Sequence, residues 1–260
     1  MFSITLHKKD LTILESLQAY FGGIGKIYPQ GKTGVQFQVF SLQELTNIII
    51  TFFNKYRLIT QKQADFELFK MAFEIINRKE HLSIEGLRKI VAIKSSINWG
   101  LPQELRKQFP DIIITTRPLI EVPQILDSHW VAGFVAGEAC FMIKLKPAQT
   151  KLGEAAHLEF QISQSLRDEQ LMINFISYFK AGKCHNNGKA IDFRVAKFSD
   201  IIEKIIPFFD KYPVIGTKYQ DYIDFKLVSE LMKNKAHLTR EGLDKIRLIK
   251  SGANKGRKLI

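Results

Sequence analysis

The sequence predicts an α+β fold built from two pseudo-symmetric repeats of the αββαββα type, the first of them truncated at its N-terminus. The first observation behind this is that residues 79–100 match residues 235–256 in 13 of 22 positions. The second is that two further pairs of segments match in the same order along the chain. The third is that hydrophobic residues in each repeat change between the strand period of two and the helix period of 3.6. Together these observations indicate a duplicated domain.

The offset between the repeats changes along the chain. "FFNKYRLITQKQADFELFK" from Phe52 pairs with "FFDKYPVIGTKYQDYIDFK" from Phe208 at an offset of 156. "FSITLHKKDLTILESLQAYF" from Phe2 pairs with "FQISQSLRDEQLMINFISYF" from Phe160 at an offset of 158. We expect a two-residue difference in a hairpin loop to account for the change.

Each repeat opens with a strand, a helix and two further strands. In the second repeat "FQIS" alternates with period two, and "DEQLMINFISYF" places Leu171, Phe175 and Phe179 at helical spacing. "GKCHNNGKAIDFRVAKF" follows as a hairpin that turns at Asn187-Gly188, because this dipeptide favours a tight turn.

Helices complete each repeat. "SDIIEKIIPFF" begins with Ser199 or Asp200 as its N-cap, and "YQDYIDFKLVSELMKNK" is a longer amphipathic helix. The last helix has Thr239 as its N-cap. His81 and His237 recur just before the last helix of each repeat, and we interpret both as structural residues.

The predicted domains are an N-terminal repeat at 1–100, a linker at 101–126 and a C-terminal repeat at 127–260. The linker carries four of the eight prolines and does not recur. Residues 128–158 have no counterpart in the first repeat. The repeat offset places the missing helix about 30 residues before Met1, so we expect the chain to begin inside its first repeat and its activity to be impaired.

Composition narrows the class of protein. The 260 residues are 45% hydrophobic with a net charge of +12, which favours a globular protein with a polyanionic partner. The alternative is a merely basic soluble protein. The two cysteines form no C-x-x-C pair, which argues against a zinc site. No apolar run approaches the roughly 20 residues of a membrane span, and the residues from Met1 to Asp10 do not have the pattern of a signal peptide, so we expect neither feature. The abundance of Phe, Ile, Lys and Asn is typical of an A+T-rich genome and indicates an organelle.

The stretch "SHWVAGFVAGEACFMIKLK", residues 128–146, carries the strongest chemical signal. Ser128 can cap a helix in which Gly133 and Gly137 form a face with almost no side chain, suited to close approach of a second helix. Glu138 then lies at the helix C-terminus, where the helix dipole disfavours an anion. A hard divalent cation such as Mg²⁺ would compensate. The alternatives are a core helix with incidental glycines and a solvated acid.

"VAGFVAGEA", residues 131–139, resembles the nine-residue signature of the LAGLIDADG homing endonucleases. Glu138 stands at the acidic eighth position, whereas Ala139 replaces the usual glycine. The resemblance extends from Phe2 to about Gly256 and is closest to the single-chain, two-repeat type encoded in fungal mitochondrial introns. It implies that two signature helices pack together and that their acids hold divalent ions over the scissile phosphates. It also implies two four-stranded sheets that form a DNA-binding β-saddle, in a monomer located in the mitochondrion.

Alternating residues on these sheets would face the DNA. In the second repeat the predicted DNA-binding residues are Met142, Lys144, Lys146, His157, Glu159, Gln161, Ser163, Lys183, His185, Asp192, Arg194 and Ala196. In the first repeat they are Ser3, Thr5, Lys26, Tyr28, Gln36, Gln38 and Phe40. The alternative is an ordinary amphipathic sheet with one solvated face.

The resemblance also suggests catalytic residues beside Glu138, the predicted metal ligand. Gln164 fits the polar residue that ends the second strand, although its repeat partner is Leu6. Lys218 and its partner Lys62 fit the lysine that stabilises phosphate charge. Lysines that support the fold are the alternative.

Two functions remain. The first is a site-specific double-stranded DNA endonuclease of the intron-homing type, dependent on Mg²⁺. The second is a non-cleaving nucleic-acid-binding protein, such as an intron-splicing maturase that also binds RNA. The acids distinguish the two, and the endonuclease is favoured because Glu138, Gln164 and Lys218 occur together.

Overall fold

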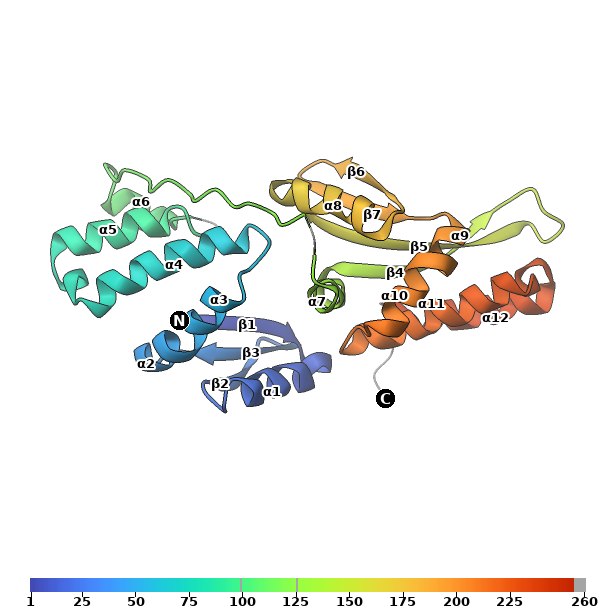
Figure 1. The fold of residues 1–260 in the computed structure, drawn as a ribbon, viewed down its shortest axis with the longest axis horizontal. Helices are drawn as coiled ribbons and strands as arrows, with labels where there is room; N and C mark the ends of the chain where they lie inside the picture. Colours follow the sequence, from blue (N-terminus) through green and yellow to red (C-terminus); the bar gives the residue numbers. More distant parts are fainter. Residues whose placement is uncertain (99, 125, 255–260) are drawn as a thin grey trace. The chain divides into compact units, whose positions relative to one another are not determined.

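The computed structural model describes residues 1–98, 100–124 and 126–254 of the chain (Figure 1). They form two compact units. The first comprises Met1–Ile4, Gln18–Tyr28 and Phe37–Pro123, and the second comprises Thr5–Leu17, Pro29–Gln36 and Gln124–Ile260. The second unit thus includes two short segments of the first predicted repeat, and the domain boundaries predicted from the sequence stay predictions.

The first repeat follows the predicted order of strand, helix, two strands and helices. Its three strands form a sheet in the order β1-β3-β2. The elements are β1 (Phe2–His7), η1 (Lys8–Asp10), α1 (Leu11–Tyr20), β2 (Lys26–Gln30), β3 (Gly34–Val39), α2 (Leu42–Glu44), the π-helical η2 (Leu45–Ile50), α3 (Thr51–Lys55), α4 (Lys62–Asn77), η3 (Glu80–Leu82) and α5 (Ile84–Lys94). A short helix, α6 (Gln103–Gln108), lies within the predicted linker.

The second repeat has the same order, preceded by one additional helix and strand. Its antiparallel sheet has the order β4-β5-β7-β6. The elements are α7 (Ser128–Glu138), β4 (Ala139–Pro147), β5 (Glu154–Ser165), η4 (Leu166–Asp168), α8 (Glu169–Phe179), β6 (Lys183–Asn187), β7 (Ala190–Val195), α9 (Phe198–Asp200), the π-helical η5 (Ile201–Ile205), α10 (Ile206–Lys211), α11 (Thr217–Lys233), η6 (Ala236–Leu238) and α12 (Arg240–Gly252). The predicted α+β class is confirmed.

One face of the second sheet forms the core of its unit. Phe141, Phe160 and Phe193 come from three neighbouring strands and are fully buried. The ring of Phe141 lies 5.4 Å from the rings of both Phe209 and Phe225, which come from the covering helices. Burial of each such side chain contributes about 1.5–3 kcal/mol. Since side chains alternate along a strand, this packing turns the intervening polar residues to the opposite face.

The cap predicted for α7 is wrong by one residue. Asp127, not Ser128, precedes the helix in an extended conformation, and its Oδ1 accepts a hydrogen bond of 2.9 Å from Trp130 N. Ser128 lies in the first turn, where its hydroxyl bonds to the hydroxyl of Tyr178. Both residue types are good caps, so the sequence pattern alone did not separate them.

The cap predicted for the helix at "SDIIEKIIPFF" is also wrong. Lys197 precedes α9, so Ser199 and Asp200 lie inside the helix. Asp200 accepts a hydrogen bond of 2.6 Å from Lys204 instead. By contrast, Thr239 caps α12 as predicted, since its Oγ1 accepts from Gly242 N at 3.1 Å.

The change of offset between the repeats has two sources, not the single hairpin loop that we expected. Gly25 and Gly182 are equivalent, because both have positive φ and an added Cβ on either would collide with the backbone of the neighbouring strand. The offset between them is 157, so one extra residue precedes Gly25. The other lies in the hairpin turn, which has three residues at 31–33 but two at 188–189. The predicted hairpin is present, but its turn lies one residue later than predicted, at Gly188-Lys189, because Asn187 is the last residue of β6 and pairs with Ala190.

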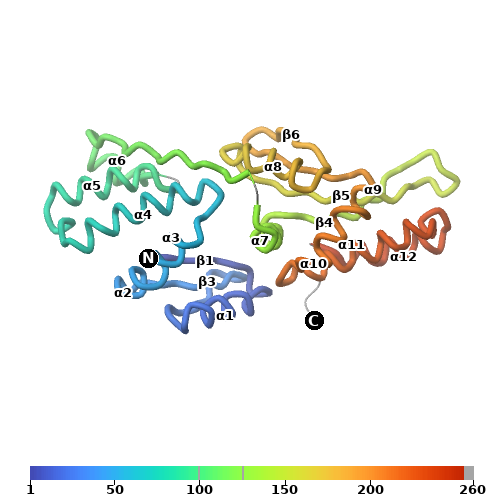
Figure 2. Tube along the Cα trace, viewed as in Figure 1, coloured from blue at the N-terminus to red at the C-terminus, as the bar shows by residue number. Residues whose placement is uncertain are grey.

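Two features of the second unit position the candidate site. Figure 2 shows the chain passing from α7 directly into β4, and shows α11 and α12 as an antiparallel pair. Helix α11 packs against β4 and β5. Within the described ranges, no helix combines the length and hydrophobicity needed to cross a bilayer.

Candidate functional site

Glu138 is the last residue of α7, and Ala139 is the first residue of β4. Ala139 has φ −94° and ψ 166°, and its N–H donates to Val135 O. This extended conformation suits any residue, so the helix ends here without the glycine that a left-handed exit would require. The boundary between helix and strand therefore fixes the position of the Glu138 carboxylate.

Three side chains act on the Glu138 carboxylate. Gln164, near the end of β5, hydrogen-bonds to it. Lys218, in the first turn of α11, donates a hydrogen bond of 2.7 Å from Nζ to Ala139 O. Asp168, at the end of η4, adds a nearby negative charge. The structure thus brings the predicted Glu138, Gln164 and Lys218 together.

The pKa of Glu138 is raised above the usual value of a glutamate. Desolvation by the surrounding protein is the main cause, and the charge of Asp168 acts in the same direction. The hydrogen bond from Gln164 and the charge of Lys218 oppose it. Although the side chain reaches the surface, its ionised form is disfavoured here, and a bound cation would favour it.

Asp168 was missed by the sequence reasoning. It is 7% exposed and occupies the position in the second repeat that Asp10 occupies in the first. The recurrence of an aspartate at an offset of 158 was the available signal.

The side chains around Glu138 offer oxygen atoms, which a hard divalent cation prefers, but too few of them to complete its coordination. Glu138 offers a carboxylate, and Gln164 Oε1 lies 3.2 Å from Ser165 N, from which it accepts. Across the described part of the chain, no group of three or more His, Cys, Asp and Glu residues could hold a metal ion. Glu138 as a metal ligand stays a prediction, and water and phosphate oxygens would have to complete any coordination sphere built on these residues.

Lys62 lies in the first unit. Its Nζ is 2.7 Å from Asn98 Oδ1 and 3.2 Å from Asp65 Oδ2. Asp65 also accepts a hydrogen bond of 2.6 Å from Arg117, a residue of the predicted linker that donates to Gln61 O as well. Burial alone would raise the pKa of Asp65, but the hydrogen bonds from Arg117, Asn98 and Lys62 lower it overall. A catalytic role for Lys62 stays a prediction.

The outward face of the second sheet carries the predicted DNA-binding residues. Those that are exposed are Lys146, His157, Lys183, His185 and Ala196. Those that are half-buried are Met142, Lys144, Glu159, Gln161, Ser163 and Arg194. Lys144 and Glu159 form an ion pair of 2.7 Å, so part of the charge on this face is already balanced.

Asp192 corrects one prediction. It is 1% exposed and not free to read a base, because it accepts hydrogen bonds from Ser163 at 2.6 Å and from Arg194 at 2.5 Å. Gln161 donates to Ser163 at 2.8 Å and completes the network. Burial alone would raise the pKa of Asp192, but these hydrogen bonds lower it, so the residue stays charged and orients Arg194.

The predicted residues of the first sheet lie as the alternation requires, except Phe40. Ser3, Thr5, Lys26 and Tyr28 are exposed, and Gln36 and Gln38 are half-buried. Phe40 and Ala196 each lie one residue beyond the end of their strand, which corrects their placement in β3 and β7.

The glycines of α7 lie on an open face. An added Cβ at Gly133 or Gly137 would meet no described atom within 4 Å. Close packing of a second helix on this face stays a prediction.

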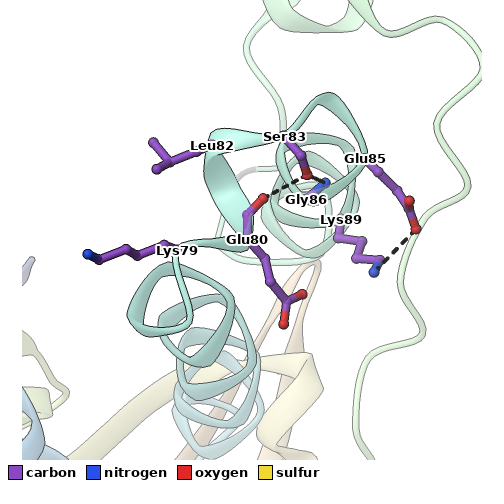
Figure 3. Close-up of a pocket in the computed structure, with 7 residues that line it drawn as sticks. All are labelled: Lys79, Glu80, Leu82, Ser83, Glu85, Gly86 and Lys89. Carbon is purple, nitrogen blue, oxygen red and sulfur yellow. Dashed lines mark hydrogen bonds and ion pairs between the residues drawn. The ribbon is translucent and has the colours of Figure 1, made fainter.

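A cavity of about 460 Å³ lies elsewhere, where η3 meets α5 (Figure 3). It is lined by Lys79, Glu80, Leu82, Ser83, Glu85, Gly86 and Lys89. Ser83 Oγ accepts from Gly86 N at 3.0 Å, and an added Cβ at Gly86 would lie 1.9 Å from Glu80 O. The cavity contains none of the predicted catalytic residues and reflects the tight turn into α5.

The chain is similar to known proteins over most of its length. A family model described as "LAGLIDADG endonuclease" matches residues 1–73 and 131–229. The "Probable intron-encoded endonuclease 3" of Neurospora crassa is 40% identical over 252 residues, covering 95% of this chain and 47% of that protein. The chain spans about half the length of the curated relatives it matches.

Solved structures match over nearly the whole chain. The I-SmaMI LAGLIDADG homing endonuclease bound to cleaved DNA has 46% identity and a TM-score of 0.96, covering 99% of this chain and 87% of that one. I-SmaMI bound to uncleaved DNA in the presence of calcium ions has 46% identity and a TM-score of 0.95, covering 98% of this chain and 88% of that one.

Proposed function

The chain belongs to the LAGLIDADG endonuclease family, and we propose that it is a site-specific double-stranded DNA endonuclease of the intron-homing type. The observation that carries the proposal is the junction of α7 and β4, where Glu138 meets Gln164 and Lys218. A relative of similar sequence is named as an intron-encoded endonuclease, and a solved structure of the same fold holds cleaved DNA.

Each residue at the junction would have its own role in the hydrolysis of a phosphodiester. Glu138 would hold a divalent ion, which we propose to be Mg²⁺ and which would supply charge stabilisation and activation of a water molecule. Lys218 places a positive charge beside the same carboxylate, where a phosphate would approach. Gln164 has both donor and acceptor atoms, so it can orient a water molecule for attack. The calcium ions present with I-SmaMI and its DNA target support a divalent metal.

The DNA would lie on the outward faces of the two sheets. The net charge of +12 attracts phosphates. The ion pair with Asp192 orients the guanidinium of Arg194, which would make a bidentate contact to guanine. Two repeats in one chain supply two sheets, so a monomer can span a long pseudo-symmetric target. We also propose that the protein acts in the mitochondrion, which agrees with its composition and with the intron-encoded relatives.

The test is cleavage of supercoiled plasmid that carries a target selected from random DNA. The Glu138→Gln variant should lose cleavage in Mg²⁺ but keep its affinity for DNA in metal-free buffer. Glu154→Gln is the matched control, because Glu154 is a partly exposed residue on β5 that pairs with Arg247. It should cut as the parent does.

Two results would contradict the proposal. Cleavage by Glu138→Gln at the parental rate would remove Glu138 from the mechanism. A parent protein that binds the selected DNA tightly but never cuts it would instead be a non-cleaving binder.

A further inference from the structure

The N-terminus of α11 is capped by a residue from the start of the chain. Gly216, which precedes the helix, has no side chain to offer. Asp10 fills the position: its Oδ1 accepts from Thr217 N at 2.8 Å, and its Oδ2 accepts from Thr217 Oγ1 at 3.2 Å. Both residues belong to the second unit. A carboxylate at this point satisfies a free N–H group and interacts favourably with the helix dipole.

The backbone before α11 is shaped to admit Asp10. Gly216 has φ +70°, a conformation that favours glycine. An added Cβ would lie 2.6 Å from Asp10 Oδ1 and 2.5 Å from Ile13 Cδ1. Any other residue would therefore both strain the backbone and displace the carboxylate, so the contact depends on both Asp10 and Gly216.

The capped turn carries Lys218. Its Nζ donates to Ala139 O at 2.7 Å, and Ala139 directly follows Glu138. A continuous series of contacts thus runs from Asp10 through Thr217 to Lys218 and the junction of α7 and β4. If the first turn of α11 opens, the Lys218 ammonium loses the backbone that aims it at this junction.

We propose that Asp10 is a positioning residue for Lys218. It holds the first turn of α11, and so keeps the lysine ammonium beside Glu138. The consequence for catalysis rests on the proposed function, but the effect on Lys218 itself does not. Asp10 follows β1 of the first repeat, so it ties the end of that strand to the cleavage centre formed by the second repeat.

The first experiment measures the reactivity of Lys218 by pulsed acetylation and mass spectrometry. Lys226 is the internal reference, because it lies on the same helix and has its own partner, Asp210, at 2.6 Å. In Asp10→Ala, acetylation of Lys218 relative to Lys226 should rise about fivefold, the effect of one lost cap on a local equilibrium. In Asp10→Asn, whose side chain can still cap the helix, the ratio should return to near the parental value.

Ser83→Ala is the control for the loss of a helix cap as such. It removes the cap of α5, which lies in the first unit, and should leave the Lys218 ratio unchanged. An unchanged ratio in folded Asp10→Ala would overturn the proposal, and so would an equal rise at Lys218 and Lys226. If Asp10→Ala does not fold, Asp10→Glu, which displaces the carboxylate by one methylene, takes its place with the same expectation.

The second experiment follows each strand of a labelled target duplex. Asp10→Ala should slow cleavage at the Glu138 centre about fivefold while leaving DNA affinity unchanged, and Asp10→Asn should restore the rate. Equal slowing of both strands would count against a role at one centre. If the parent protein does not cut DNA, the proposed function fails, whereas the acetylation ratio still decides whether Asp10 positions Lys218.

Discussion

Replacing Glu138 by glutamine should stabilise the protein at the same time as it removes the proposed metal ligand. Glu138 ends the eleven-residue helix α7, where the negative end of the helix dipole repels a carboxylate. Such an anion costs about 0.3–1 kcal/mol, and because the Glu138 side chain reaches the surface, screening favours the lower half of that range. We expect the free energy of unfolding to rise by about 0.5 kcal/mol in Glu138→Gln at pH 8, or roughly 1–2 °C in Tm.

The raised pKa of Glu138 determines how the stability difference between the parent and Glu138→Gln changes with pH. The pKa of Glu138 is raised in the folded protein, chiefly by desolvation, so folding favours its protonated form. Below the usual glutamate value of 4.5 the residue is neutral in both states, and parent and variant should be equally stable. The advantage of glutamine should appear as the pH rises through the raised pKa and should then stay constant.

The assay is urea denaturation in metal-free buffer at pH 4 and pH 8. Glu169→Gln is the control with the opposite sign, because Glu169 lies in the first turn of α8, another eleven-residue helix, where the dipole favours an anion. A Glu138→Gln protein that is less stable than the parent at pH 8 would refute this reasoning. So would a difference of the same size at both pH values.

Three further predictions concern the cap of α7, the linker contact of Arg117 and the binding of DNA. Asp127→Ala removes the cap of α7 and should lower the free energy of unfolding by about 1 kcal/mol in urea denaturation; an unchanged value would mean that water replaces the bond to Trp130. Arg117→Ala takes the main hydrogen-bond partner from Asp65 and should cost about 1–3 kcal/mol by the same measurement, whereas a loss below 0.5 kcal/mol would show that the linker contact is dispensable. DNA binding, followed by fluorescence anisotropy, should weaken steeply with salt, and salt-independent affinity or a dimer on one site would contradict binding by a basic monomer.

The sequence was sufficient for the parts of the fold that depend on local pattern. The repeats placed the strands and helices in order, and the alternation around Phe141 and Phe160 predicted which side chains are buried. The signature stretch led to Glu138, and the family resemblance that it carries led to Lys218, which the structure places beside it. The order of the elements and the buried faces follow the repeats and the period of a helix or strand, so a single sequence shows them, whereas the role of Lys218 was implied by the resemblance.

Contacts between distant segments could not be predicted in this way. Nothing near Thr217 in the sequence indicates that Asp10 caps its helix. The burial of Asp192 depends on Ser163 and Arg194 meeting over it, although its position in the alternation suggested an exposed reader. In both cases the carboxylate satisfies hydrogen-bond donors that only the folded chain brings together.

The direct passage from α7 to β4 also restricts how this sequence can evolve. Successive residues of a strand point to opposite faces, so one residue inserted between Glu138 and Ala139 would shift the strand that follows by one position. Phe141 would then leave the core or Glu138 would move away from Lys218, and no change of side chain could repair both. The turn at residues 148–153, which joins β4 to β5, can change in length without altering the pairing of either strand. We therefore expect natural insertions and deletions to accumulate at that turn and to be absent at the junction.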